Sequence, residues 1–267
     1  MDAWLLVYAA IGGVFGFLAG LLGIGGGAVA VPLTTMAFAA QDFNRETILH
    51  TALGTGMATI VFTSLASLRA HHKLGGVDWI IVRRMTPGIV IGTFLATVIA
   101  RYIPTFPLAI IFVCFLFYMA TTMLFSWQPK PTRQMPGPIG QHVAGFLIGG
   151  GSGIVGIGGG AIATPYMVFC NVPFRTAIGT SAALGLPISL TGTVGYIING
   201  WGHAGLPPYS VGYVYLPALI GFVIASMAAA PWGASLSHRL STKVLKKIFA
   251  VVMYALVTKM FFTLLDS

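Results

Sequence analysis

The hydrophobic residues of this chain gather in long apolar runs that short polar segments separate. A helix needs about 20 mostly apolar residues to cross the hydrocarbon core of a bilayer. Two shorter runs, 28–40 and 161–171, each follow a glycine-rich break, and we expect half-helices or re-entrant segments there. The longer runs predict membrane spans at roughly 4–22, 51–70, 79–100, 105–126, 139–156, 177–198, 209–231 and 242–264.

A polar, proline-rich segment at 128–138 separates two halves of the chain, because proline and glycine at this density are typical of a connection. We therefore expect a first transmembrane repeat over 1–127 and a second repeat over 139–267. The segment itself is the expected linker between the two repeats.

The two halves resemble each other in sequence. Gly16–Pro32 aligns with Gly149–Pro165 at a constant offset of 133 residues (16 to 149, and 32 to 165). Ala52–Gly56 then resembles Ala177–Ser181 at an offset of 125 (52 to 177), so the first half holds extra residues near 41–48. Duplicated halves with glycine-interrupted spans at matching positions indicate a transporter whose site lies at the breaks.

The composition assigns most of the surface to lipid. Hydrophobic residues make up 57% of the chain and charged residues only 7%, whereas a soluble domain carries about 25% charged residues. The formal net charge of +9 comes from basic residues in short groups between the apolar runs. This distribution follows the positive-inside rule, and it lacks the dense basic patch that nucleic-acid binding needs. We expect an all-α integral membrane protein that binds no nucleic acid.

The reactive side chains are too dispersed for an enzyme or a metal site. Cys114 and Cys170 both lie in apolar runs, fit neither a disulfide framework nor a metal cluster, and are expected to be buried packing residues. The spans hold no nucleophile with an accompanying base. We therefore expect no catalytic residues, no metal ligands and no cofactor.

The basic residues also indicate how the two repeats lie in the membrane. Segment 69–84 is basic, whereas the matching connection near 199–209 has no Lys or Arg. The next connection reverses this, with Arg101 alone in 101–105 but four basic residues in 236–247. Inverted repeats would give this pattern and parallel repeats would not. We expect a helical bundle of two inverted repeats with 8–10 spans, including the two broken segments, and with 69–84, 130–133 and 236–247 in the cytoplasm.

The two Gly-Ile-Gly-Gly-Gly breaks, 23–27 and 156–160, are the strongest candidates for a binding site. Irregular backbone at membrane depth is tolerated only where protein or a water-filled cavity covers it. A helix that begins directly after each break would aim free N–H groups and its positive dipole end at the break, which favours an anion. The alternative is close helix packing, which is our interpretation of the upstream Gly12, Gly16, Gly20, Gly149 and Gly153.

Hydroxyl and basic side chains recur at matching positions beside the breaks. Thr55 and Thr180 share a repeat position, and Ser181 follows Thr180. Their hydroxyls would bind oxyanion oxygens without adding charge, or would instead bond to backbone carbonyls and neighbouring helices. His50 and Arg175 also share a position, and would either attract the anion at opposite mouths of the path or lie at the interface as snorkelling side chains.

The expected site thus has two parts. The path or gating residues are His50 and Arg175. The substrate-binding residues are Gly23, Gly25, Gly26, Gly27, Thr55, Gly156, Gly158, Gly159, Gly160, Thr180 and Ser181.

These motifs, together with the stretch His71–Trp79, resemble those of the TauE/SafE family of sulfite and sulfonate exporters. The resemblance covers nearly the whole chain. It implies transport of sulfite, sulfoacetate or a related organosulfonate, in the direction of export, across a bacterial inner membrane. The first half departs from the second where Gly56 stands in place of Ser181.

The expected partners are a small anionic substrate and the lipid bilayer, and the sequence specifies no oligomeric state. An anion channel and an uptake permease for an organic anion share all these features and remain the alternatives to an exporter.

Overall fold

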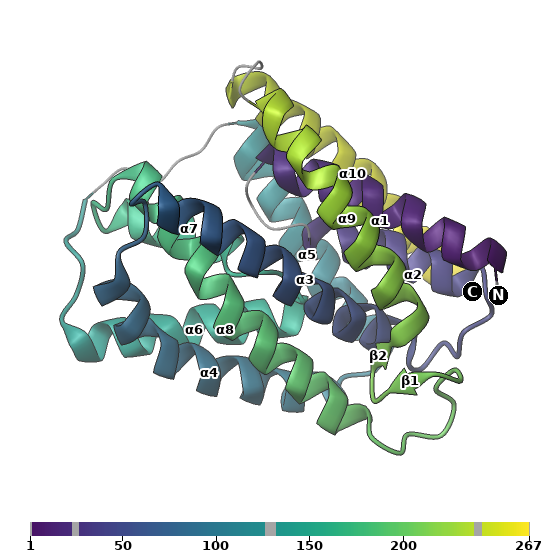
Figure 1. The fold of residues 1–267 in the computed structure, drawn as a ribbon. Coiled ribbons are helices and arrows are strands. Elements are labelled where there is room, and N and C mark those ends of the chain that lie inside the picture. The colour runs from purple at the N-terminus through teal and green to yellow at the C-terminus, as the bar shows by residue number, and fades with distance from the viewer. Residues whose placement is uncertain (1, 23–26, 126–131, 238–241, 267) are drawn as a thin grey trace.

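The computed structural model describes residues 2–22, 27–125, 132–237 and 242–266, and nearly all of them are helical (Figure 1). The helices lie close to the predicted apolar runs, and four of them, α3, α4, α5 and α8, are long and apolar enough to cross a membrane. The chain is therefore an all-α integral membrane protein. Its elements are α1 (Asp2–Leu22), α2 (Gly27–Ala39), α3 (Ile48–Lys73), α4 (Trp79–Tyr102), α5 (Thr105–Leu124), α6 (Pro138–Val155), α7 (Gly160–Phe169), α8 (Phe174–Gly200), β1 (Ser210–Val211), β2 (Val214–Tyr215), α9 (Leu216–Ser237) and α10 (Thr242–Asp266).

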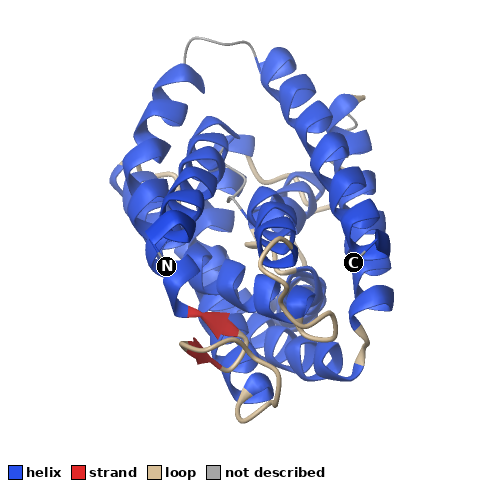
Figure 2. Cartoon of the chain, turned by 90° about the vertical axis from the view of Figure 1, so that its right-hand side faces the viewer, coloured by secondary structure: helices blue, strands red, loops and turns tan. Residues whose placement is uncertain are grey.

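The sequence did not predict the short antiparallel hairpin of β1 and β2. Ser210 pairs with Tyr215 and Val211 with Val214, and Gly212 adopts the positive φ of 55° that the tight connection needs. The run expected to span 209–231 therefore becomes helical only at Leu216. Figure 2 shows the hairpin at one end of the bundle, which we name the hairpin end.

Helices α3 and α8 occupy corresponding positions in the two repeats and pack against each other in antiparallel orientation. Thr55, near the start of α3, accepts a hydrogen bond from the backbone N–H of Tyr215, which follows α8. Thr180, near the start of α8, accepts one from the N–H of Asp78, which follows α3. Each helix therefore begins where the other ends. We name the end that holds Asp78 the linker end.

The outer helices exchange partners between the repeats, so that α1 packs on α9 and α6 packs on α4 (Figure 1). A methyl group added to Gly12 would lie 2.8 Å from Phe222 Cα, and one added to Gly149 would lie 2.9 Å from Ile89 Cα. Backbone approach this close requires glycine. The predicted packing role is confirmed for Gly12, Gly16, Gly149 and Gly153, whereas the surroundings of Gly20 are not described.

Helices α5 and α10 also form an antiparallel pair between the repeats. Phe106 at the start of α5 lies beside Phe261 near the end of α10, with ring centroids 6.2 Å apart. Farther along α5, Thr121 is hydrogen-bonded to Tyr254 in the middle of α10. The α3–α8 and α5–α10 pairs are therefore both antiparallel, and each joins the first half of the chain to the second.

Helices α1 and α2 form a pair whose outer ends lie together at the hairpin end, and α6 and α7 form such a pair at the linker end. The Tyr8 hydroxyl of α1 donates to Gln41 Oε1, two residues beyond α2, over 2.8 Å. In the second repeat, the carbonyl of Phe169 at the end of α7 accepts from the N–H groups of Thr132 and Arg133, which precede α6. Each pair therefore leaves the bundle at the end where it enters.

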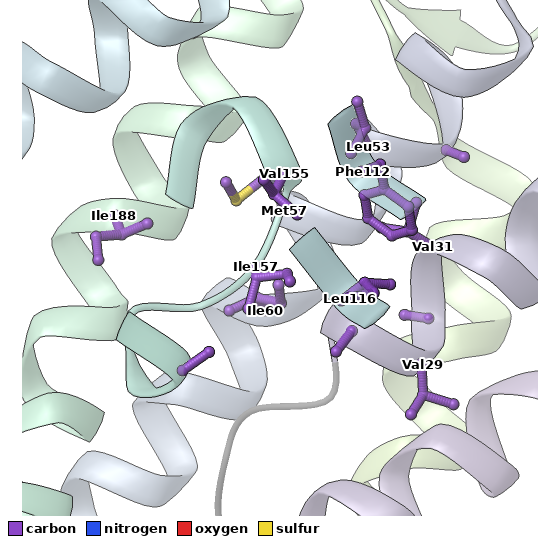
Figure 3. Close-up of a cluster of buried hydrophobic side chains, with 14 of the residues drawn as sticks. Val29, Val31, Leu53, Met57, Ile60, Phe112, Leu116, Val155, Ile157 and Ile188 are labelled. Carbon is purple, nitrogen blue, oxygen red and sulfur yellow. The ribbon is translucent and has the colours of Figure 1, made fainter. Parts of the chain in front are cut away.

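The surface and the core are both apolar, as a lipid-embedded bundle requires. Large side chains such as Ile139 and Trp232 are 82% and 77% exposed, and the centre of the bundle is filled by aliphatic and aromatic residues (Figure 3). Cys170 is buried as expected, but the expectation for Cys114 was wrong because this side chain is exposed on α5. An apolar run gives no indication of which of its residues face lipid.

Candidate functional site

The second glycine break is a sharp turn between two helices rather than a bend within one helix. Helix α6 ends at Val155, and α7 begins at Gly160. Gly156 terminates α6 in the left-handed conformation, with φ of 65°, and its N–H donates to the carbonyl of Ser152. A side chain at this position would be strained and would also contact Leu53 Cδ2 at 2.5 Å.

The turn contains a row of backbone N–H donors that lack hydrogen-bond partners among the described residues. Within the described residues, the N–H groups of Gly158, Gly159, Gly160 and Ala161 have no hydrogen-bond partner, because the first bonds of α7 run from Ile162 and Ala163 to the carbonyl of Gly159. Three of these four residues are buried, and Gly160 is half-buried. Unpaired donors at a helix N-terminus are costly inside a protein unless an acceptor or a water molecule approaches them. An anion is the ligand that such a row favours.

The two breaks meet near the centre of the molecule. A methyl group on Gly27, the first residue of α2, would lie 2.9 Å from the carbonyl oxygen of Gly156 and 3.3 Å from Ile157 Cα. It would also lie 2.6 Å from Ile60 Cδ1 of α3. Gly27 therefore brings the start of α2 against the turn of the other repeat. The other expected residues of the first break, Gly23, Gly25 and Gly26, lie outside the described residues.

The meeting point lies near mid-depth of the bundle. Ile60 is 12 residues along the 26-residue α3, which places it about 18 Å from the start of that helix. The surroundings are apolar, with Met57, Ile157 and Ile188 beside the turn (Figure 3). Low polarity strengthens the attraction between backbone dipoles and a charged ligand.

Matching prolines weaken the first turns of both half-helices. Pro32 in α2 and Pro165 in α7 occupy the same repeat position. Each proline lacks an N–H, so the carbonyls of Ala28 and Ala161, four residues earlier, receive no hydrogen bond from it. Each half-helix therefore lacks one backbone hydrogen bond in its interior.

The predicted hydroxyl groups are buried but have protein partners. Thr55 and Thr180 accept the backbone hydrogen bonds that join the repeats, over 3.0 and 2.9 Å. Ser181 accepts from Thr164 and donates to the carbonyl of Ile178. The structure therefore brings Thr55 towards the hairpin end and Thr180 towards the linker end, while the glycine turn lies between them.

His50 and Arg175 stand at opposite ends of the central helix pair. His50 lies in the first turn of α3, is buried, and has its Nε2 atom 2.9 Å from the carbonyl oxygen of Ala100. Arg175 lies in the first turn of α8 at the linker end and is exposed. The two residues are thus placed at the two ends, as expected, but in unlike surroundings.

Ser152 is a polar residue beside the turn that the sequence analysis missed. Its side chain is fully buried, and its Oγ atom has no hydrogen-bond partner among the described residues. Its carbonyl accepts from Gly156 and Ile157, so it belongs to the turn. No signal in the repeat could have found it, because Ala19 stands at the matching position of the first half.

Comparisons with known proteins agree with this architecture. The family model "Sulfite exporter TauE/SafE" matches residues 8–260. A "Probable membrane transporter protein" of Haemophilus influenzae is 36% identical over 98% of this chain and 99% of its own length. A relative with the same designation in Methanocaldococcus jannaschii is 25% identical over 91% of this chain and 90% of its own length.

The Bacillus subtilis protein YunE, also described as a probable membrane transporter, is 23% identical over 93% of this chain and 94% of its own length. No solved structure matches the chain. The family and these relatives are membrane transporters and not enzymes. The match over nearly the whole chain, together with the repeated half-helices, assigns this membrane transporter to the sulfite exporter TauE/SafE family.

Proposed function

We propose that this transporter exports a small sulfur-containing anion, such as sulfite, sulfoacetate or a related organosulfonate, across the bacterial cytoplasmic membrane. The anion would bind between the two glycine breaks. The observation on which this depends is the row of N–H groups from Gly158 to Ala161 at mid-depth, which have no hydrogen-bond partner among the described residues. Such a row attracts negative charge without a formal cation.

The sulfur anion class comes from the family, whose model is described as a sulfite exporter. The site chemistry supports this class, because sulfite and sulfonate groups carry several acceptor oxygens on one small head. Several convergent N–H donors suit such a head. The buried Ser152 hydroxyl would add a further donor.

Inverted repeats are part of the proposal, and the antiparallel α3 and α8 support them. Both helices are candidate spans, and they are repeat-related, so opposite directions across the membrane would invert one repeat against the other. Each repeat would combine one re-entrant pair with three spans. Basic side chains are also distributed unequally between the two ends of the bundle, since Arg69, Lys73 and Arg175 lie at the linker end. The positive-inside rule then places that end in the cytoplasm.

Export would follow the membrane potential. The cell interior is negative, and an anion that leaves gains about 2.3 kcal/mol per charge per 100 mV. One re-entrant pair, together with the helix that packs on it, would move against the corresponding group of the other repeat. This movement would open the central site alternately to each end of the bundle.

The test measures anion flux into proteoliposomes that contain the Gly159→Leu variant of the protein. The new side chain would fill the space before the free N–H groups, and the atom nearest to its Cβ is the flexible end of Ile188. We expect the variant to insert and fold but to lose at least about 90% of sulfite or sulfonate flux, as expected when a binding site is blocked.

Gly13→Leu is the matched control, because an added Cβ at Gly13 meets nothing within 4 Å. It should transport like the unchanged protein. Saturable flux supports a carrier, whereas flux proportional to concentration favours a channel. Normal flux through Gly159→Leu would refute the glycine site.

A further inference from the structure

A second group of polar side chains lies at the hairpin end, apart from the glycine turn. The His50 ring lies 5.3 Å from the Tyr213 ring, measured between centroids, and the His203 ring lies 5.9 Å from Tyr213 on another side. Arg101, at the end of α4, faces Tyr213 closely enough for its charge to act on the phenol. Side chains far apart in sequence, from α3, from α4 and from the loop before α9, therefore come together.

The His50 imidazole has one occupied and one free nitrogen. Nε2 lies 2.9 Å from the carbonyl oxygen of Ala100, and a carbonyl only accepts, so Nε2 carries a hydrogen. Nδ1 has no hydrogen-bond partner among the described residues, although His50 is only 3% exposed. In the neutral ring Nδ1 is a bare acceptor, and in the protonated ring it becomes a donor that needs an acceptor.

The groups that face His50 supply no acidic side chain for that donor. On α4 and the residues after it, the ring meets the backbone carbonyls of Ala100 and Ile103, and before α3 it meets the carbonyl of Glu46. From the loop before α9 it faces His203 and Tyr213. Burial raises the pKa of the Tyr213 phenol, with the charge of Arg101 opposing, so the phenol stays a neutral hydroxyl.

The matching position in the other repeat has different chemistry. Arg175 is exposed and permanently charged at the linker end, whereas His50 is enclosed and carries a charge only when protonated. The loop that encloses His50 exists in one repeat only, since residues 201–215 join α8 to α9, whereas the shorter 74–78 joins α3 to α4. The two ends of the central helix pair therefore differ in chemistry at these matching positions.

We propose that protonated His50 binds the transported anion through Nδ1 and forms, with His203 and Tyr213, a second anion subsite at the hairpin end. The ligand is a small oxyanion of the sulfonate or sulfite type, and this rests on the proposed transport function. Anion binding and proton binding at His50 strengthen each other, because a protonated ring attracts the anion and a bound anion favours the protonated ring. The anion affinity of this subsite therefore rises as the pH falls.

Methanesulfonate binding to the purified protein tests this subsite, because this probe keeps its charge across the pH range. We expect binding about tenfold tighter at about pH 5.5 than at about pH 8, because only the protonated imidazole offers the anion a charged donor. His50→Gln should remove the pH dependence. His142→Gln, an exposed histidine on α6 at the linker end, should retain it.

Nitrogen NMR of the histidine rings in the unchanged protein gives a second measurement that needs no variant. Addition of methanesulfonate at low pH should shift the Nδ1 resonance of His50 and leave that of His142 in place. An unshifted His50 resonance overturns the subsite, as does a His50→Gln variant with unaltered pH dependence. If either result accompanies normal sulfite or sulfonate flux, the transport proposal stands. Absence of both binding and flux in the unchanged protein would refute both proposals.

Discussion

Thr55 and Thr180 each join the two repeats through a single side chain. The hydroxyl groups of Thr55 and Thr180 each accept the backbone N–H of the residue that precedes a helix of the other repeat, α9 and α4 respectively. The adjoining Gly54 and Gly179 allow the same loops to approach, since a methyl group at either would overlap backbone of Tyr213 or Gly76. A threonine and a glycine near the start of each central helix thus hold the loop that follows the other central helix.

Thr55→Val and Thr180→Val should each lower the free energy of unfolding by about 1 kcal/mol, because each leaves one backbone N–H without its acceptor. Equilibrium unfolding in mixed detergent micelles measures the loss. Thr63→Val is the control, because the Thr63 hydroxyl donates only to the carbonyl of Ile60 on its own helix. An equal loss in all three variants would contradict a special role for the two inter-repeat bonds.

At the scale of elements, glycine decides which helices pair. The α4–α6 and α1–α9 contacts both depend on glycines spaced four residues apart, and each glycine has a neighbour in sequence that points away from the contact. Gly149 lies against Ile89, whereas an added methyl at Gly150 would meet only the Gly92 carbonyl oxygen at 3.9 Å. Adjacent glycines on one helix therefore differ sharply in tolerance.

Gly149→Ala should destabilise the protein by about 1–3 kcal/mol, because its methyl group would force the backbones of α4 and α6 apart. Gly150→Ala should be neutral or slightly stabilising, because alanine favours helix more than glycine does. Thermal unfolding of the two variants in detergent compares them directly. Equal melting temperatures would show that α4 and α6 do not pack through Gly149.

At the scale of the whole molecule, the antiparallel packing of α3 on α8 leads to a prediction about membrane topology. The loops after α3 and α8 correspond in the two repeats but lie at opposite ends of the bundle, as the bonds of Thr55 and Thr180 require. If both helices span the membrane, one loop faces the cytoplasm and the other faces outward.

Cysteine labelling in intact cells tests this topology. Leu74→Cys and Ala204→Cys place thiols in the two corresponding loops, at exposed positions, in a background where Cys114 and Cys170 are serine. An impermeant maleimide should label the cysteine at 204 and should label the one at 74 only after the membrane is opened. Labelling of both from the same side would establish parallel repeats instead.

The sequence by itself determined the membrane class, the positions of the helices and the duplication. The thickness of the bilayer sets the length of a span and of its apolar run. Gly156 ends a helix through its own backbone freedom, and Pro32 and Pro165 each remove one hydrogen bond inside a helix. The family resemblance also followed from these local patterns. The hairpin at 210–215 escaped because two-residue strands carry almost no periodicity.

Only the tertiary structure decided which surfaces meet. It placed Gly27 of one repeat against Gly156 of the other, and it placed Thr55 and Thr180 at opposite ends of the bundle. It left Cys114 exposed. It also buried His50 beside Tyr213, with Nδ1 lacking a hydrogen-bond partner among the described residues. An apolar run reads alike on its buried and lipid-facing sides, since lipid is as apolar as the core. Contacts across the bundle therefore depend on packing that no local pattern specifies.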